Sequence, residues 1–143
     1  MPVSKTYQAE GLVLKSIPFG EAGLLVTLYS RESGKLKAVA KGARRSNSKI
    51  VGHFEPLTVA KLSLAKGRSL DIVNQVEVTE NFSSLKSNLT TLTRGLYVAE
   101  LVDGFGSEAN SNQRLYDLAV ETLQAIQQHP SWELILRRFE LHL

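Results

Sequence analysis

At 143 residues, 43% hydrophobic and 22% charged, the chain is close to globular averages, so we expect a packed core, in one ordinary domain or in a small barrel with a helical partner. The absence of cysteine excludes disulfides and thiolate zinc sites, and no apolar run approaches the roughly 20 residues of a membrane-spanning helix, so we expect a cytoplasmic protein. The formal charge of +3 is uneven, because residues 1–80 hold 12 Lys and Arg against 7 Asp and Glu, whereas residues 81–143 hold 5 against 7; a polyanionic partner is therefore expected for the first part.

Short apolar runs separated by turn signals indicate five strands within a first domain, residues 1–80. We place them at residues 9–17, 24–30, 35–43, 56–64 and 70–78. Gly34 closes the turn before the third strand, where we expect a positive φ. Five short strands in about 75 residues fit an oligonucleotide-binding (OB) barrel. The predicted fold class is therefore α+β, an N-terminal five-stranded OB-fold barrel followed by an all-helical domain.

From Phe82 onward the pattern is helical, which defines a second predicted domain, residues 81–143. The first predicted helix ends near Gly104 or Gly106 and has the apolar stripe Leu85, Leu89, Leu92, Leu96 and Ala99. Ser111 or Asn112 is expected to cap a second helix, which stops at Pro130 and has the stripe Leu115, Leu118, Thr122 and Ile126. Ser131 is expected to cap a third, with Trp132, Ile135, Leu136, Phe139 and Leu143 on its apolar side. That helix is still amphipathic at Leu143, so we expect a fragment of a longer protein.

The third strand and the loop after it carry the candidate DNA-binding residues. Strand alternation places three lysines on one side, and a loop rich in arginine, serine and asparagine follows. Cations can track a phosphate backbone while hydroxyls and amides donate to its oxygens. A solvated strand face with a loop explains the charge pattern equally well. An aromatic ring on the neighbouring strand could stack a base if exposed, although core packing is its commoner role. The candidates are Lys35, Lys37, Lys41, Arg44, Arg45, Lys49 and Tyr29.

No catalytic or metal-binding motif is recognisable. Gly34-Lys35 lacks the upstream glycine and the following Ser or Thr of a phosphate-binding loop. Carboxylates such as Glu10, Glu32 and Asp71 stand singly and form no nuclease-type metal cluster in sequence. We therefore expect no enzyme, no catalytic residue, no metal and no cofactor.

Several segments resemble, in order and spacing, the N-terminal domain of the bacterial RecO family. They are residues 11–14 (GLVL), 19–28 (FGEAGLLVTL), 34–36 (GKL) and 38–45 (AVAKGARR). Residues 97–102 and 137–141 are similar to helical segments of that family, so the resemblance spans the whole chain.

This resemblance implies an OB barrel with a helical domain and a mediator of DNA repair and recombination. Its partners would be single- and double-stranded DNA, RecR and the single-strand-binding protein, with RecA loaded indirectly and complementary strands annealed without nucleotide hydrolysis. The resemblance also implies that the protein is associated with the nucleoid and does not bind membranes. The cysteine zinc site of some members cannot be carried over. The main alternative is a protein-interaction adaptor whose barrel docks partner proteins; an enzyme such as a phosphodiesterase is a third.

Overall fold

A computed structural model describes residues 5–106, 112–128 and 131–143. Its first half is organised by one long strand, β1 (Thr6–Phe19), which pairs antiparallel with β4 (Val59–Ala65) along its first part and with β2 (Gly23–Ser30) along its second. A register shift between Val13 and Lys15 breaks the regular ladder where the strand passes from one partner to the other. β3 (Gly34–Ala40) pairs with β2, and β5 (Asp71–Glu80) pairs with β4.

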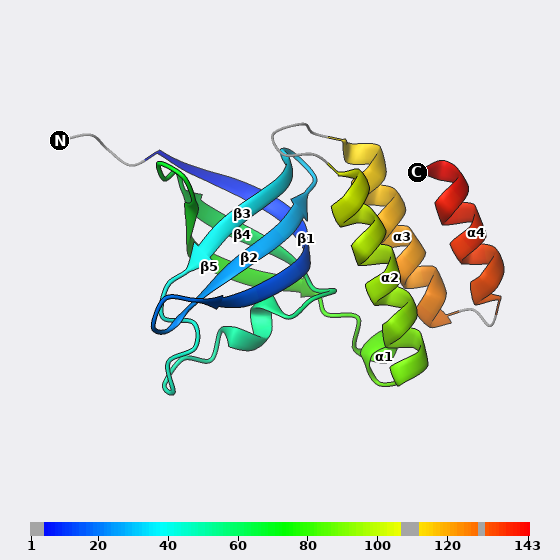
Figure 1. The fold of residues 1–143 in the computed structure, drawn as a ribbon, viewed down its shortest axis with the longest axis horizontal. Helices are drawn as coiled ribbons and strands as arrows, with labels where there is room; N and C mark the ends of the chain where they lie inside the picture. Colours follow the sequence, from blue (N-terminus) through cyan, green and yellow to red (C-terminus); the bar gives the residue numbers. More distant parts are fainter. Residues whose placement is uncertain (1–4, 107–111, 129–130) are drawn as a thin grey trace.

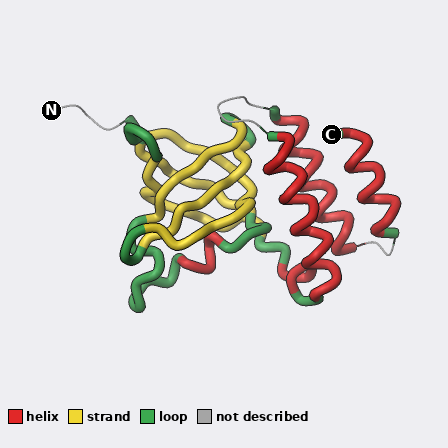
Figure 2. The backbone as a smooth tube through the Cα atoms, viewed as in Figure 1, coloured by secondary structure: helices red, strands yellow, loops and turns green. Residues whose placement is uncertain are grey.

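Two parallel pairs between β3 and β5, Ala38 with Asp71 and Val39 with Ile72, close the barrel in the order β1-β2-β3-β5-β4 (Figures 1 and 2). The connection from β3 to β4 contains a short 3-10 helix, Val51–Phe54. A five-stranded barrel followed by helices is the predicted fold class. Gly34 has the expected positive φ, 71°.

Both faces of the central part of β1 are buried, which explains its unbroken apolar run. Val13 points into the barrel interior, whereas Leu12 and Leu14 point outward and pack beneath the helices. At Gly11 a Cβ atom would lie 2.5 Å from Leu28 Cδ1, so the approach of β2 requires glycine there. The barrel therefore has one core inside and a second on its outer face.

The helical half consists of α1 (Ser83–Lys86), α2 (Leu89–Phe105), α3 (Gln113–Gln128) and α4 (Trp132–His142). α2 and α3 lie against the barrel, and α4 lies on their far side (Figure 1). Among the described residues, no helix is long and apolar enough to cross a membrane.

The prediction of a single helix from Phe82 onward is wrong. The first helical segment, α1, ends at Lys86, and a second helix, α2, starts after the N-cap residue Asn88. The Asn88 side chain accepts hydrogen bonds from the backbone N–H groups of Thr90 and Thr91. The break changes the helical phase, so Leu89 and Leu96 of the predicted stripe are 78% and 42% exposed. Leu85 and Ala99 of the predicted stripe are buried as expected, and α2 also buries Gly95, Val98 and Val102.

The other helix starts are partly as predicted. The Asn112 side chain accepts from the Leu115 backbone N–H at 3.1 Å and so caps α3, while Ser111 and Pro130 lie outside the described residues. Ser131 occupies the N-cap position of α4, as predicted, but its side chain makes no capping hydrogen bond. The apolar side of α4 is confirmed, with Leu136 and Phe139 buried.

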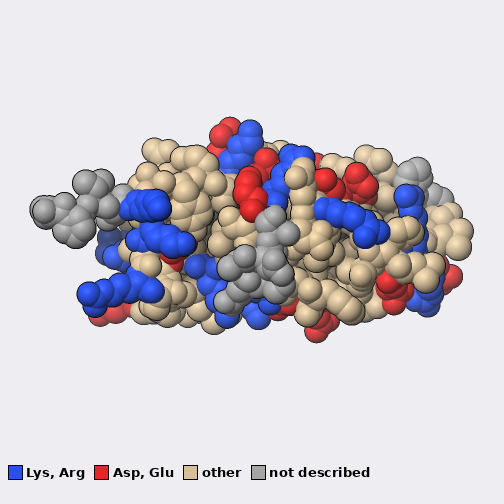
Figure 3. Space-filling view, turned by 90° about the horizontal axis from the view of Figure 1, so that it is seen from above, with Lys and Arg blue, Asp and Glu red and all other residues tan. Residues whose placement is uncertain are grey.

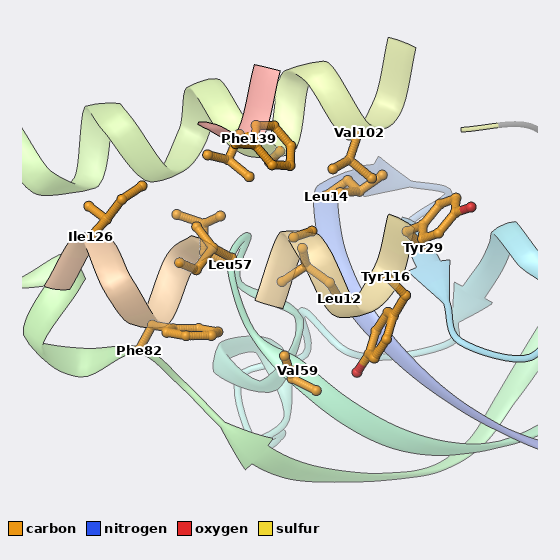
Figure 4. Packing of buried hydrophobic residues seen from close by; sticks show 14 of the residues in the cluster. Leu12, Leu14, Tyr29, Leu57, Val59, Phe82, Val102, Tyr116, Ile126 and Phe139 are labelled. Atoms are coloured by element: carbon orange, nitrogen blue, oxygen red, sulfur yellow. The ribbon is translucent and has the colours of Figure 1, made fainter. Parts of the chain in front are cut away.

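One hydrophobic cluster joins the barrel to the helices. Figure 4 shows Leu14 of the barrel beside Val102 of α2, and the same cluster includes Leu12 and Val59 of the barrel and Ile126 of α3. Polar contacts surround it. Since the cluster runs across the boundary, the division into domains 1–80 and 81–143 stays a prediction.

The polar contacts at this boundary pair barrel residues with helical residues. Lys15 Nζ lies 3.2 Å from Asp103 Oδ2, and the Tyr116 hydroxyl donates to Glu10 Oε1 at 3.3 Å. These contacts flank the shared apolar cluster, so they add directional restraints to a boundary held mainly by apolar burial.

Candidate nucleic-acid interface

A groove of about 700 Å³ lies where the start of β1, the start of β3 and the connection between β4 and β5 meet. We call it the lysine groove, and define it by the residues Lys5, Thr6, Tyr7, Glu32, Ser33, Lys35, Leu36, Lys37, Lys66, Ser69, Leu70 and Asp71. This set contains four lysines and two carboxylates. The excess of positive charge is the pattern that a phosphate backbone requires.

A second hollow of about 480 Å³ lies beyond the short ladder between β3 and β5. Lys41 at the end of β3 and Lys61 of β4 line it, together with residues 73–77 of β5. Because β3 and β5 run parallel, the lysine groove flanks one end of their ladder and the second hollow flanks the other. Seen from above, blue side chains gather over the barrel end next to the N-terminus, whereas red and blue mix over the helical half (Figure 3).

Tyr7 and Asp71 meet in the lysine groove. The Tyr7 hydroxyl donates a hydrogen bond to the Asp71 carboxylate, and the backbone N–H of Gly67 donates to Asp71 Oδ1 at 3.1 Å. Burial and the Asp71 hydrogen bond both raise the pKa of Tyr7, so its hydroxyl keeps its proton and stays a donor. Lys66 Nζ lies 5.9 Å from the centroid of the Tyr7 ring.

The predicted lysines of β3 have different surroundings. Lys37 is exposed and lines the lysine groove, and Lys41 is exposed and lines the second hollow. Lys35 also lines the groove, but its side chain is only 16% exposed and its Nζ lies 2.8 Å from Asp103 Oδ1 of α2. Hydrogen bonds from Lys35 and Lys15 lower the pKa of Asp103. The charge of Lys35 is thus largely matched by a helical carboxylate.

Arg44 has a structural role that the charge pattern did not indicate. Its Nε donates to the carbonyl of Gly23 at 2.8 Å, and its Nη2 donates to the carbonyls of Gly20 and Glu21 at 2.9 and 3.1 Å. The guanidinium therefore ties the connection after β3 to the turn between β1 and β2. Arg45 and Lys49 are exposed on the same connection and line neither the groove nor the second hollow.

Tyr29 cannot stack a base in this structure, which corrects the prediction. The residue is 1% exposed and belongs to the cluster shared by the barrel and the helices. A Cβ atom at Gly106 would lie 2.5 Å from Tyr29 Cε2, which shows how closely the end of α2 covers the ring. Alternation did put Tyr29 on the outer face of β2, but that face is covered by helices.

The sequence reasoning missed Lys5, Lys61, Lys66 and Tyr7. Lys5 lies directly before β1, Tyr7 is on β1, Lys61 is on β4 and Lys66 is in the connection after β4; these lysines stand singly and form no basic run. Closure of the barrel between β3 and β5 is what brings them beside the lysines of β3. The described residues contain no group of three or more His, Cys, Asp or Glu side chains that could hold a metal ion.

Comparisons with known proteins match both halves of the chain. The family model "Recombination protein O N terminal" matches residues 3–82, and "Recombination protein O C terminal" matches residues 86–143. The chain is 40% identical over 133 residues to the DNA repair protein RecO of Gloeobacter violaceus, covering 93% of this chain and 51% of that protein. It is 38% identical over 139 residues to that of Desulforamulus reducens, covering 97% and 54%. The chain spans about half the length of these curated relatives.

Proposed function

Because the chain belongs to the RecO family of DNA repair proteins, we propose that it binds DNA through the lysine groove and the second hollow. In this proposal the protein is a recombination mediator and not an enzyme. It binds single- and double-stranded DNA, anneals complementary strands, and acts with RecR to load RecA onto DNA coated by the single-strand-binding protein. These finer activities follow from the family resemblance.

The observation that carries the proposal is the grouping of lysines from separate strands around the end of the barrel. Lys5, Lys37 and Lys66 come from three parts of the chain and line one groove. Ammonium groups bind phosphate oxygens without reading the sequence of the bases, and each such contact releases counterions. A surface of this kind favours binding with little sequence preference.

Annealing is compatible with the same surface. A protein that neutralises the phosphates of two strands lowers their mutual repulsion, and base edges that it does not occupy remain available for pairing. This step needs no energy source, in keeping with a mediator that hydrolyses no nucleotide.

The proposal is tested by titrating the chain with labelled oligonucleotides at several salt concentrations and comparing it with the double variant Lys37→Ala, Lys66→Ala. Each lost phosphate contact lowers the slope of log K against log salt by about 0.7 for a single strand, so the double variant should lose about 1.4. The affinity at low salt should fall for every sequence alike.

A matched control removes the same charge from the helical half. Arg114 and Arg138 are exposed on α3 and α4, so Arg114→Ala with Arg138→Ala should leave the salt slope unchanged. If the salt slope is the same for all three proteins, the lysine groove is not the DNA-binding site. Failure of the unaltered chain to bind at low salt would favour the adaptor alternative, and turnover of DNA with magnesium or manganese would favour an enzyme.

A further inference from the structure

The lysine groove contains apolar residues that phosphate binding alone does not require. Tyr7, Leu36 and Leu70 line it, and all three are only partly buried. Tyr7 and Leu36 also pack against the interior core of the barrel, so the groove has an apolar floor and a rim of lysines. A flat apolar surface between cations suits a nucleobase with its flanking phosphates.

The ring of Tyr7 is held in place before any ligand arrives. Its hydroxyl donates to Asp71 of β5, and the backbone N–H of Gly67 donates to the same carboxylate at 3.1 Å. The ring, which belongs to β1, is therefore held by a hydrogen bond to β5. A fixed aromatic surface loses little conformational entropy when a base packs on it.

We infer that Tyr7 is a base-stacking residue of the lysine groove, and that the preferred ligand is a single strand with an unpaired base on this ring. The inference rests on the proposed function. Lys66 Nζ lies over the ring, 5.9 Å from its centroid. A base that stacks there displaces this ammonium group, which can then bind a phosphate adjoining that base. Lys37, which also lines the groove, supplies another cation.

This arrangement separates two parts of DNA binding. The lysines serve single strands and duplexes alike, because both carry phosphates. Only a strand with unpaired bases can use Tyr7, since a duplex keeps its bases inside the stack and must break pairs to present one. Preference for single strands should therefore depend on Tyr7, and total affinity should depend on the lysines.

The test compares Tyr7→Leu and Tyr7→Phe with the unaltered chain on three probes of about 15 positions, near the upper site size of an OB fold. The probes are a thymidine oligonucleotide, an abasic strand with the same phosphates, and a duplex. Tyr7→Leu should bind the thymidine strand about 5- to 100-fold more weakly. Its affinity for the other two probes should stay within about twofold. Tyr7→Phe keeps the ring and should retain most of the thymidine-strand affinity.

A purely structural role for Tyr7 gives a different result. Loss of the Asp71 hydrogen bond would then weaken binding of all three probes by the same factor, in Tyr7→Phe as in Tyr7→Leu, and that outcome overturns the inference. If the double variant Lys37→Ala, Lys66→Ala binds DNA more weakly while Tyr7→Leu has the affinity of the unaltered chain for every probe, the stacking inference is wrong and the proposed function stands. If the unaltered chain binds no probe, both fail.

A second measurement does not depend on affinity. The chain has one tryptophan, Trp132, which lies on α4 away from the groove. In Tyr7→Trp, the thymidine strand should quench fluorescence beyond the response of the unaltered chain, and the abasic strand should not. Equal quenching by both strands would contradict stacking.

Discussion

The burial of Tyr29 gives a prediction that separates a core role from a DNA-binding role. Tyr29→Ala removes a ring that is 1% exposed and fills the space between β2 and the end of α2. Truncation of a buried aromatic side chain to alanine costs about 3–5 kcal/mol of unfolding free energy, because the transfer and cavity terms add. The backbone of β2 is fixed by pairing with β1 and β3, so the site cannot collapse far, and the upper part of that range is expected. For a domain of this size the melting temperature should fall by roughly 10–15 °C.

Thermal and urea unfolding followed by circular dichroism measure this cost. Tyr29→Phe is the matched control, since it keeps the ring and should lower the unfolding free energy by about 1 kcal/mol or less. The fraction of Tyr29→Ala that stays folded at low temperature should bind a single strand as the unaltered chain does. An unchanged melting temperature combined with weaker binding of single strands would refute the core assignment and restore Tyr29 as a base-stacking residue.

Two further predictions concern Arg44 and Asp103. Arg44→Ala loses three hydrogen bonds from the guanidinium to carbonyls and should lower the unfolding free energy in urea by about 1–2 kcal/mol, a modest loss because the side chain is partly solvated. The control Arg45→Ala makes the same charge change and should leave the unfolding free energy nearly unchanged. Equal losses in the two variants would contradict the role of Arg44 in the turn. Asp103→Asn releases the charge of Lys35 and should raise DNA affinity at low salt while lowering stability by about 1 kcal/mol at neutral pH. The pKa of Asp103 is lower folded than unfolded, so this stability is present above its ordinary pKa and is lost as the pH falls through the lowered pKa of the folded state. If the difference in stability between the two proteins stays the same in strong acid, the ion pair is contradicted.

The barrel was predictable because its strands obey local rules. Leu24, Val26 and Leu28 lie on one face of the strand, and all three belong to the interior core, as their period of two predicts. Gly34 supplies the positive φ that the turn needs. Such signals depend on residues within one turn or strand, so no knowledge of the tertiary structure was required.

The errors came from contacts between distant segments. The outer face of β2 was identified correctly, but no local signal shows that α2 covers it, and Tyr29 therefore stayed among the candidate base-stacking residues. The predicted stripe of the first helix was wrong only at Leu89 and Leu96, which are exposed because Asn88 starts a new helix and a different face of it meets the barrel. Lys66 was missed because its partners in the groove lie on β1 and β3.

The helical half therefore helps to decide which face of the barrel is open to DNA. Lys35 on β3 is matched by Asp103 near the end of α2, so the helical half takes up part of the positive charge of this strand. Helices cover the outer face around Leu12 and Tyr29, so that face is closed to DNA, and the proposed site lies on the side where β3 meets β5. On that side the lysine groove and the second hollow flank the same short ladder. The position of α2, and not the run of basic residues alone, thus limits where the phosphate backbone can lie.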